Sequence, residues 1–100
     1  MPVRVRPLAA SDHEAWLPLW RGYLQFYKTS VPDTVTDTTW GRLLDPESGI
    51  FGFGAFREDR LVGFVHFLYH PVTWSVSERC YLEDLFVHPD ERNSGAGRAL

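Results

Sequence analysis

Apolar and polar residues alternate in four separate stretches of the chain, which is the pattern of β-strands with one buried face. The predicted strands are residues 3–6, 50–57, 61–69 and 77–87. In the second stretch Gly52 and Gly54 share one face, which indicates either that another side chain packs closely there or that the strand bends. A short polar turn at 58–60 joins the second and third stretches, which together predict an antiparallel hairpin.

Two helices are predicted between the first and second strands. Ser11 and Glu14 form a capping-box pattern, so the first helix should begin there and run to about Tyr27. Its aromatic residues recur every three or four positions, which places one helical face against the core: Trp16, Trp20, Tyr23 and Tyr27. Pro18 removes a backbone donor inside this helix, so we expect a kink just before it or a helix that restarts there. A second, shorter helix is expected over residues 36–44.

The predicted order is strand, helix, helix, three strands and the start of a last helix, which is a mixed α/β arrangement. The chain has 100 residues and no linker, so a single domain is expected over residues 1–100. No stretch approaches the roughly 18 uninterrupted apolar residues that a membrane span needs. The N-terminus lacks the apolar core of a signal peptide, so we expect a cytoplasmic protein without a membrane partner.

Charge and cysteine content argue against several classes of function. The formal net charge is −3 and the ten basic residues form no run, which argues against a nucleic-acid partner. The acidic balance weakly favours a cationic acceptor such as an amine. A single cysteine, Cys80, rules out an intrachain disulfide and leaves no zinc cluster, and the four histidines lack ligand spacing. We therefore expect no metal site.

A glycine-rich loop, Arg92-x-x-Gly95-x-Gly97, follows the last predicted strand and precedes the start of a helix. This order gathers several backbone N–H groups and a helix N-terminus at one place, where they can hold a phosphate. Arg92 adds a guanidinium, and the two glycines let a ligand approach the main chain closely. The pattern therefore predicts a phosphate-binding loop, with a merely structural turn as the alternative.

At these residues the sequence resembles the GNAT superfamily of acetyl-CoA-dependent N-acetyltransferases, whose pyrophosphate loop has the form Arg/Gln-x-x-Gly-x-Gly/Ala directly after a strand. The strand Tyr-Leu-Glu-Asp-Leu-Phe-Val at 81–87 resembles that of polyamine-type and related bacterial members. The resemblance implies an acyl-CoA N-acyltransferase fold, in which an antiparallel meander leads into a strand–loop–helix unit that binds CoA. The family's C-terminal part, which often supplies a tyrosine general acid, would lie beyond Leu100. We therefore expect a truncated product or a chain that a partner completes.

The resemblance also implies which residues hold acetyl-CoA, the expected co-substrate. The main chain of the last strand should bind the pantetheine arm, and the loop should cradle the pyrophosphate with a second arginine at its mouth. The predicted cofactor-binding residues are Leu85, Phe86, Val87, Arg92, Asn93, Ser94, Gly95, Ala96, Gly97 and Arg98.

Glu83 is the predicted catalytic base, because a carboxylate in the middle of an apolar strand needs either a partner or a chemical role. In the resembled members the matching glutamate acts on the amine, usually through water. The alternative is that Glu83 faces solvent or pairs with Arg79. Asp84 would lie on the opposite face by alternation, unless a bulge, which the resemblance implies, brings both carboxylates to the cleft. Asp84 is then a substrate-binding residue, as is Tyr27, since the end of the first helix borders the family's acceptor site.

The predicted function is transfer of an acetyl group from acetyl-CoA to a primary amine of a small molecule, such as a polyamine or an amino acid. Two alternatives stay open: a non-catalytic acyl-CoA-binding or scaffold module, and a protein N-acetyltransferase. A homodimer formed through unpaired strand edges is also possible.

Overall fold

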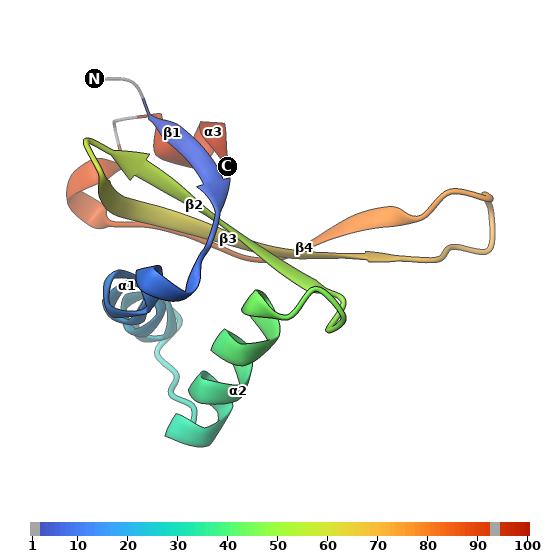
Figure 1. Cartoon of the computed structure of the whole chain (residues 1–100), viewed down its shortest axis with the longest axis horizontal. Coiled ribbons are helices and arrows are strands. Elements are labelled where there is room, and N and C mark those ends of the chain that lie inside the picture. The colour runs from blue at the N-terminus through green and yellow to red at the C-terminus, as the bar shows by residue number, and fades with distance from the viewer. Residues whose placement is uncertain (1–2, 93–94) are drawn as a thin grey trace.

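The computed structural model describes residues 3–92 and 95–100, and a four-stranded antiparallel sheet forms its centre (Figure 1). The strands lie in chain order as β1 (Arg4–Pro7), β2 (Ile50–Arg57), β3 (Arg60–His70) and β4 (Arg79–Val87). All three pairings are antiparallel, so the predicted meander is confirmed. The last strand begins two residues later than expected, because its first residue, Arg79, pairs with His70 at the end of β3.

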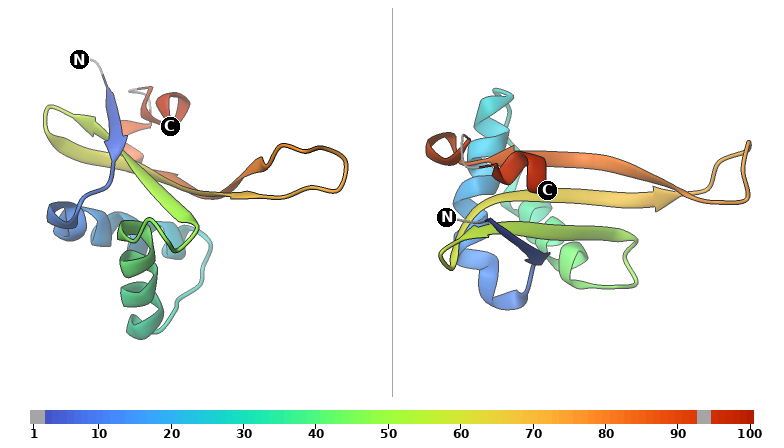
Figure 2. Two further views of the ribbon diagram at one scale, coloured as in Figure 1. Left: turned by 45° about the vertical axis from the view of Figure 1, so that its right-hand side comes forward. Right: turned by 90° about the horizontal axis from the view of Figure 1, so that it is seen from above.

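Helices cover the two faces of the sheet unequally. A 3-10 turn, η1 (Ala10–Asp12), leads into α1 (His13–Phe26), and α2 (Asp33–Leu44) follows. Both helices lie on one face, whereas the short α3 (Ala96–Ala99) lies on the opposite face (Figures 1 and 2). A second 3-10 turn, η2 (Pro89–Glu91), comes directly after β4. No helix in the described ranges is long and apolar enough to cross a membrane.

The main core lies between α1, α2 and the sheet. Its buried members are Leu8, Trp16, Leu19, Trp20, Leu43, Phe56, Leu61, Phe64 and Phe86. Trp16 is fully buried and stacks on Trp20 with ring centroids 5.5 Å apart. The glycine face of β2 points into this core, because a Cβ at Gly54 would stand 2.6 Å from Leu61 Cδ1. Close packing is therefore the reason for that glycine.

A smaller apolar cluster lies on the other face, beneath α3. Ala55, Val62, Val87 and Ala96 are buried there, and Val3, Val5 and Leu100 pack against them. This cluster seats α3 on the sheet and so places the end of the chain beside the C-terminal end of β4. The β3–β4 hairpin extends well beyond both cores, with Trp74 almost fully exposed (Figure 2).

The helix starts differ from the expectations. The capping box at Ser11 and Glu14 was wrong. The Asp12 carboxylate instead caps the 3-10 turn η1, where it accepts from the Ala9 N–H at 2.7 Å, and it binds the Arg6 guanidinium at 2.8 and 3.0 Å. The Arg6 guanidinium, opposed by partial burial, holds the pKa of Asp12 below its ordinary value.

The second helix starts three residues earlier than predicted, at Asp33, where the Pro32 carbonyl accepts from the Val35 N–H at 2.9 Å. The first helix is continuous through Pro18, so the expected restart was wrong. Trp16 and Trp20 are buried on either side of Pro18, and packing of this face stabilises both halves of the helix.

Candidate active site

A β-bulge in β4 shapes the candidate site. Asp84 lies opposite His66 on β3, but Leu82 lies opposite the very next residue, Phe67, so that Glu83 is the extra residue of the bulge. Strict alternation is broken at this point, and the two carboxylates are no longer held on opposite faces. The bulge expected in this strand is therefore present.

Asp84 is the carboxylate that the fold partly buries. Its Oδ2 lies 2.8 Å from Nδ1 of His66, and the Tyr23 hydroxyl of α1 interacts with the same carboxylate. The side chain is 16% exposed. Burial by itself would raise the pKa of Asp84, but the hydrogen bonds from His66 and Tyr23 outweigh it and hold that pKa below its ordinary value. Asp84 is therefore ionised at neutral pH.

The surroundings that lower the pKa of Asp84 raise the pKa of Tyr23. Burial, the hydrogen bond to Asp84 and the nearby charges of Asp84 and Glu83 all raise the pKa of the Tyr23 hydroxyl. The phenol therefore keeps its proton over the whole physiological range and serves as a hydrogen-bond donor. Glu83 itself is exposed at the bulge, which matches the alternative in which it faces solvent. Burial therefore singles out Asp84, not Glu83.

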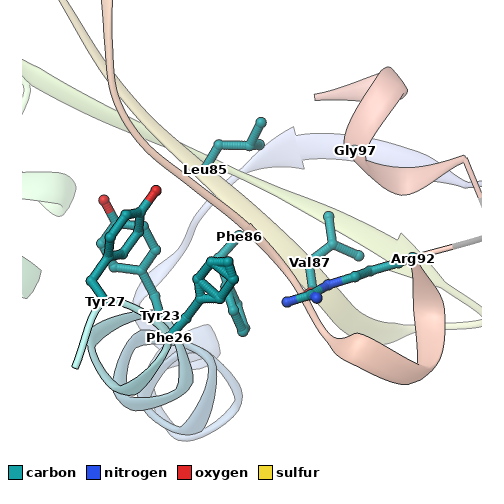
Figure 3. Close-up of a pocket in the computed structure, with 8 residues that line it drawn as sticks. All are labelled: Tyr23, Phe26, Tyr27, Leu85, Phe86, Val87, Arg92 and Gly97. Atoms are coloured by element: carbon teal, nitrogen blue, oxygen red, sulfur yellow. The ribbon is translucent and has the colours of Figure 1, made fainter.

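A pocket of about 330 Å³ lies between the C-terminal end of α1 and β4 (Figure 3). Its lining residues are Tyr23, Phe26, Tyr27, Leu85, Phe86, Val87, Arg92 and Gly97. Six of these eight residues belong to the sites predicted from the sequence, namely Tyr27, Leu85, Phe86, Val87, Arg92 and Gly97. The two tyrosine hydroxyls lie toward one end of the pocket and Arg92 toward the other.

Arg92 is fixed at the mouth of the pocket. Its Nε donates to the Val87 carbonyl at 3.2 Å, and its guanidinium carbon lies 5.5 Å from the ring centroids of both Phe26 and Phe86. The preceding turn is tied to the β2–β3 hairpin, because the buried Glu91 pairs with Arg57 at 2.7 Å and with Arg60. The ion pair with Arg57, opposed by desolvation, lowers the pKa of Glu91.

The described residues after Arg92 form a turn and the start of α3. Gly95 has a φ of +90°, which other residues rarely adopt, and α3 begins at the next residue. Ala96 is fully buried against the sheet and so anchors α3. Arg98 is exposed. Asn93 and Ser94 lie outside the described residues.

A reactive cysteine and a metal centre are the two other kinds of candidate site. Cys80 is an exposed free thiol. Within residues 3–92 and 95–100, no three His, Cys, Asp or Glu side chains come together in a way that could hold a metal ion.

Comparison with known proteins places this geometry in a family. The Acetyltransferase (GNAT) family profile matches residues 13–100, which is most of the chain. The chain belongs to the GNAT acetyltransferase family. The match includes α1, the bulged strand and the glycine-rich loop, so the family resemblance of the sequence is confirmed.

One curated relative is similar to this chain in sequence. The chain is 39% identical over 98 residues to the D-amino-acid N-acetyltransferase HPA3 of Saccharomyces cerevisiae, covering 96% of this chain and 61% of that protein. The chain thus spans about three-fifths of the length of this curated relative.

Two solved structures share the fold. The ribosomal-protein-alanine N-acetyltransferase from Brucella melitensis biovar Abortus 2308 superposes with a TM-score of 0.80 and 29% identity, over 100% of this chain and 67% of that one. AAC(6')-Iy in complex with the bisubstrate analog CoA-S-monomethyl-acetylneamine superposes with a TM-score of 0.81 and 20% identity, over the same shares of the two chains. The acyl-CoA N-acyltransferase fold expected from the sequence is therefore confirmed.

Sequence reasoning assigned no role to His66, which the structure places behind Asp84. A signal for it was present: His66 is two residues from Phe64 on the same strand, so alternation places both on the core face. Tyr23 was predicted only as part of the face of the first helix that packs against the core. Its contact with Asp84 depends on how α1 crosses the sheet, which periodicity does not specify.

Proposed function

We propose that the protein transfers an acetyl group from acetyl-CoA to a primary amine of a small molecule. The observation that carries this proposal is the pocket, which opens along β4 between Arg92 and Gly97 at one end and Tyr23 at the other, with the two carboxylates of the bulge beside it. Membership of the GNAT family supports acetyl-CoA as the acyl donor.

The lining residues fit the chemistry of an acyl-CoA. Phe26, Phe86 and Val87 offer apolar walls for the pantetheine arm, and the strand residues from Leu85 onward offer main-chain groups. Arg92 supplies positive charge for the pyrophosphate. Gly97 leaves room beside it, because a Cβ there would have an ordinary contact of 3.6 Å with Val87. The rest of the loop, including Asn93, Ser94, Gly95 and Ala96, with Arg98 at its mouth, is proposed to complete the cradle with backbone N–H groups.

We propose different tasks for the two carboxylates at the bulge. Asp84 keeps its charge, since its pKa is lowered, and an ionised carboxylate attracts an ammonium group. A carboxylate held in that state is a poor proton acceptor. Glu83, which is exposed beside it, is free to take the proton from the amine through a water molecule. Tyr27 at the rim of the pocket would contact the acceptor.

The reaction then follows in one transfer. The neutral amine attacks the thioester carbonyl, a C–N bond forms and the C–S bond breaks. The electron pair of that bond leaves on the CoA sulfur, and the thiolate takes up a proton. The amine loses one proton through water to Glu83 before attack, and Glu83 passes that proton on to solvent. The second proton leaves the nitrogen after attack and balances the one that the thiolate takes up, so that the amide, CoA and one released proton are the products. Holding both reactants at the bulge supplies most of the required proximity.

A small amine is the preferred acceptor for two reasons. The relative with 39% identity carries the name of a D-amino-acid N-acetyltransferase. In addition, two adjacent carboxylates at the site favour a cationic acceptor. The name of the Brucella structure, a ribosomal-protein-alanine N-acetyltransferase, keeps a protein N-terminus as the second candidate.

The test is Glu83→Gln in an assay of CoA release with a panel of polyamines, amino acids and N-terminal peptides. We expect turnover to fall by about a hundredfold, a typical contribution of a general base, while acetyl-CoA affinity stays unchanged. Glu78→Gln, which alters an exposed glutamate near the tip of the β3–β4 hairpin, is the matched control and should leave both unchanged. If no amine of any class releases CoA while acetyl-CoA still binds, the protein is a non-catalytic acyl-CoA-binding module.

A further inference from the structure

His66 is a polar side chain in the middle of an aromatic core. It is 1% exposed, and its ring centroid lies 4.4 Å from that of Phe64, 5.6 Å from Trp20 and 6.0 Å from Trp16. An apolar residue would fill the same space without the cost of desolvating two ring nitrogens. We therefore expect the imidazole to have a specific role, which its hydrogen-bond partners indicate.

The two ring nitrogens have partners of opposite kinds. Nε2 lies 3.1 Å from Nε1 of Trp16, and an indole N–H can only donate a hydrogen bond. Nε2 must therefore be the acceptor and carry no proton. Nδ1, 2.8 Å from Asp84 Oδ2, must then carry the proton and donate it. The contacts thus specify one tautomer, the neutral ring with its proton on Nδ1.

Asp84 receives this hydrogen bond at the point where β4 bulges. His66 and Asp84 are direct cross-strand partners, and Glu83, the extra residue of the bulge, immediately precedes Asp84. The Tyr23 hydroxyl interacts with the same carboxylate. A carboxylate has about four lone-pair sites, so these contacts leave acceptor sites for a ligand, and the side chain stays 16% exposed. His66 and Tyr23 therefore hold the group in one orientation and leave its outer side for a ligand.

We propose that His66 is a positioning residue: as the neutral Nδ1–H tautomer, fixed by the Trp16 indole, it orients the Asp84 carboxylate to bind the ammonium group of the acceptor amine. This inference rests on the proposed function, to which it adds the chain Trp16–His66–Asp84 as the means of amine recognition. His66 does not touch the substrate and acts only through Asp84. A purely structural role would instead predict a loss of stability with no change in how the amine is bound.

Two substitutions separate the functions of the ring nitrogens. In His66→Asn the side-chain amide branches at Cγ, so its N–H₂ can stand near the position of Nδ1 and still donate to Asp84. In His66→Gln the amide lies one bond further out, near Nε2, where it can satisfy Trp16 but not Asp84. Both replacements are polar and uncharged, and they differ mainly in which partner keeps its hydrogen bond.

The experiment measures KM for the amine and for acetyl-CoA in these variants. We expect His66→Gln to raise the KM of the amine about tenfold, the effect of losing one hydrogen bond to a charged group, with the KM of acetyl-CoA unchanged. His66→Asn should recover much of that loss. His70→Gln, at the end of β3 and outside the site, is the matched control and should change neither constant. Equal amine KM values in wild type and His66→Gln, with Asp84→Asn impaired, would overturn the role of His66 and leave the proposed function standing.

A second measurement does not depend on the variants folding. Long-range ¹H–¹⁵N correlation spectra of the wild-type chain at neutral pH report which nitrogen of His66 carries the proton. We expect Nδ1 to carry the proton and Nε2 to carry none. A proton on Nε2 in the wild type would overturn the inference. If the wild type acetylated no amine, the proposed function would fail and the positioning role with it, whichever tautomer the spectrum showed.

Discussion

Two neighbouring regions carry the proposed chemistry, and they are built in opposite ways. The amine side consists of Trp16, His66 and Asp84, which come from three different elements and meet in or at the edge of the core. The acetyl-CoA side is one continuous segment of sequence after β4, from Arg92 to Gly97, and its described residues include the exposed Arg92 and Gly95. The first is held by tertiary packing, and the second by its own turn and a short helix.

This difference determines how each region should respond to substitution. In a buried series of hydrogen bonds each side chain depends on its neighbours. Removal of one side chain leaves another without its partner, and this affects folding as well as binding. An exposed loop residue has few such partners, so its removal should affect the ligand and leave the fold intact. Changes on the amine side should therefore alter both stability and function, and changes on the acetyl-CoA side should alter binding alone.

Trp16→Ala should produce the largest effect. Trp16 is fully buried, stacks on Trp20 and donates to His66, so its truncation removes core volume and leaves His66 Nε2 without its donor. We expect a loss of about 3–5 kcal/mol in the free energy of unfolding, measured by urea denaturation. Trp74→Ala, at a tryptophan that is 92% exposed, is the matched control and should change stability by less than about 0.5 kcal/mol. Equal losses in the two variants would contradict the placement of the core.

Asp84→Asn should impair recognition of the amine. The substitution removes the charge that the ammonium group would face and keeps the size of the side chain. We expect the KM of the amine to rise about ten- to hundredfold with acetyl-CoA affinity unchanged, as for loss of one charge-assisted hydrogen bond. Asp90→Asn, at an exposed aspartate beyond β4, should have no such effect. An unchanged KM in Asp84→Asn would show that the amine binds elsewhere.

The same substitution has a stability signature that depends on pH. Because the pKa of Asp84 is lowered in the folded state, its ionised form stabilises the protein above the unfolded pKa of about 3.9, and this contribution is lost as the pH falls through the lower folded value. The difference in unfolding free energy between wild type and Asp84→Asn should therefore be constant near neutral pH and shrink below about pH 4. A difference that did not vary with pH would mean that the charge of Asp84 contributes nothing to the fold.

Arg92→Ala tests the other region and should have the smaller effect. Arg92 is exposed and rests on Phe26 and Phe86, so its loss removes a cation from the mouth of the pocket. We expect the Kd of acetyl-CoA to rise about tenfold with little change in stability. Arg42→Ala on α2, an exposed arginine away from the pocket, is the matched control. A large loss of stability in Arg92→Ala would contradict the contrast between the two regions.

The same contrast explains what the sequence could and could not predict. The acetyl-CoA side is continuous in sequence, so the spacing of Arg92, Gly95 and Gly97 after a strand was enough to predict it, and the first and last of these residues line the pocket. The strands were also predictable, since each follows local alternation. The start of α1 was not, because a 3-10 turn precedes it, and this turn depends on contacts of Asp12 with the Ala9 N–H and with Arg6 of the preceding strand.

The amine side was only partly predictable for a related reason. Glu83 and Asp84 stand in a recognisable strand, but which of them is buried depends on a bulge and on partners from β3 and α1. His66 and Asp84 are 18 residues apart and Trp16 is another 50 away, so no spacing rule joins them. Such a network follows from the register of the sheet and from the crossing of the helix, which local patterns do not fix.

The most direct test of the account is calorimetric titration of acetyl-CoA into the 100-residue chain and into its Gly97→Trp variant. Gly97 lines the pocket without a side chain, and an indole there would occupy the space assigned to the ligand. We predict saturable binding at one site in the wild type and none in Gly97→Trp, with unfolding curves showing that the variant still folds. Binding of equal strength in both chains, or none in the wild type, would contradict the assignment of this pocket to acetyl-CoA.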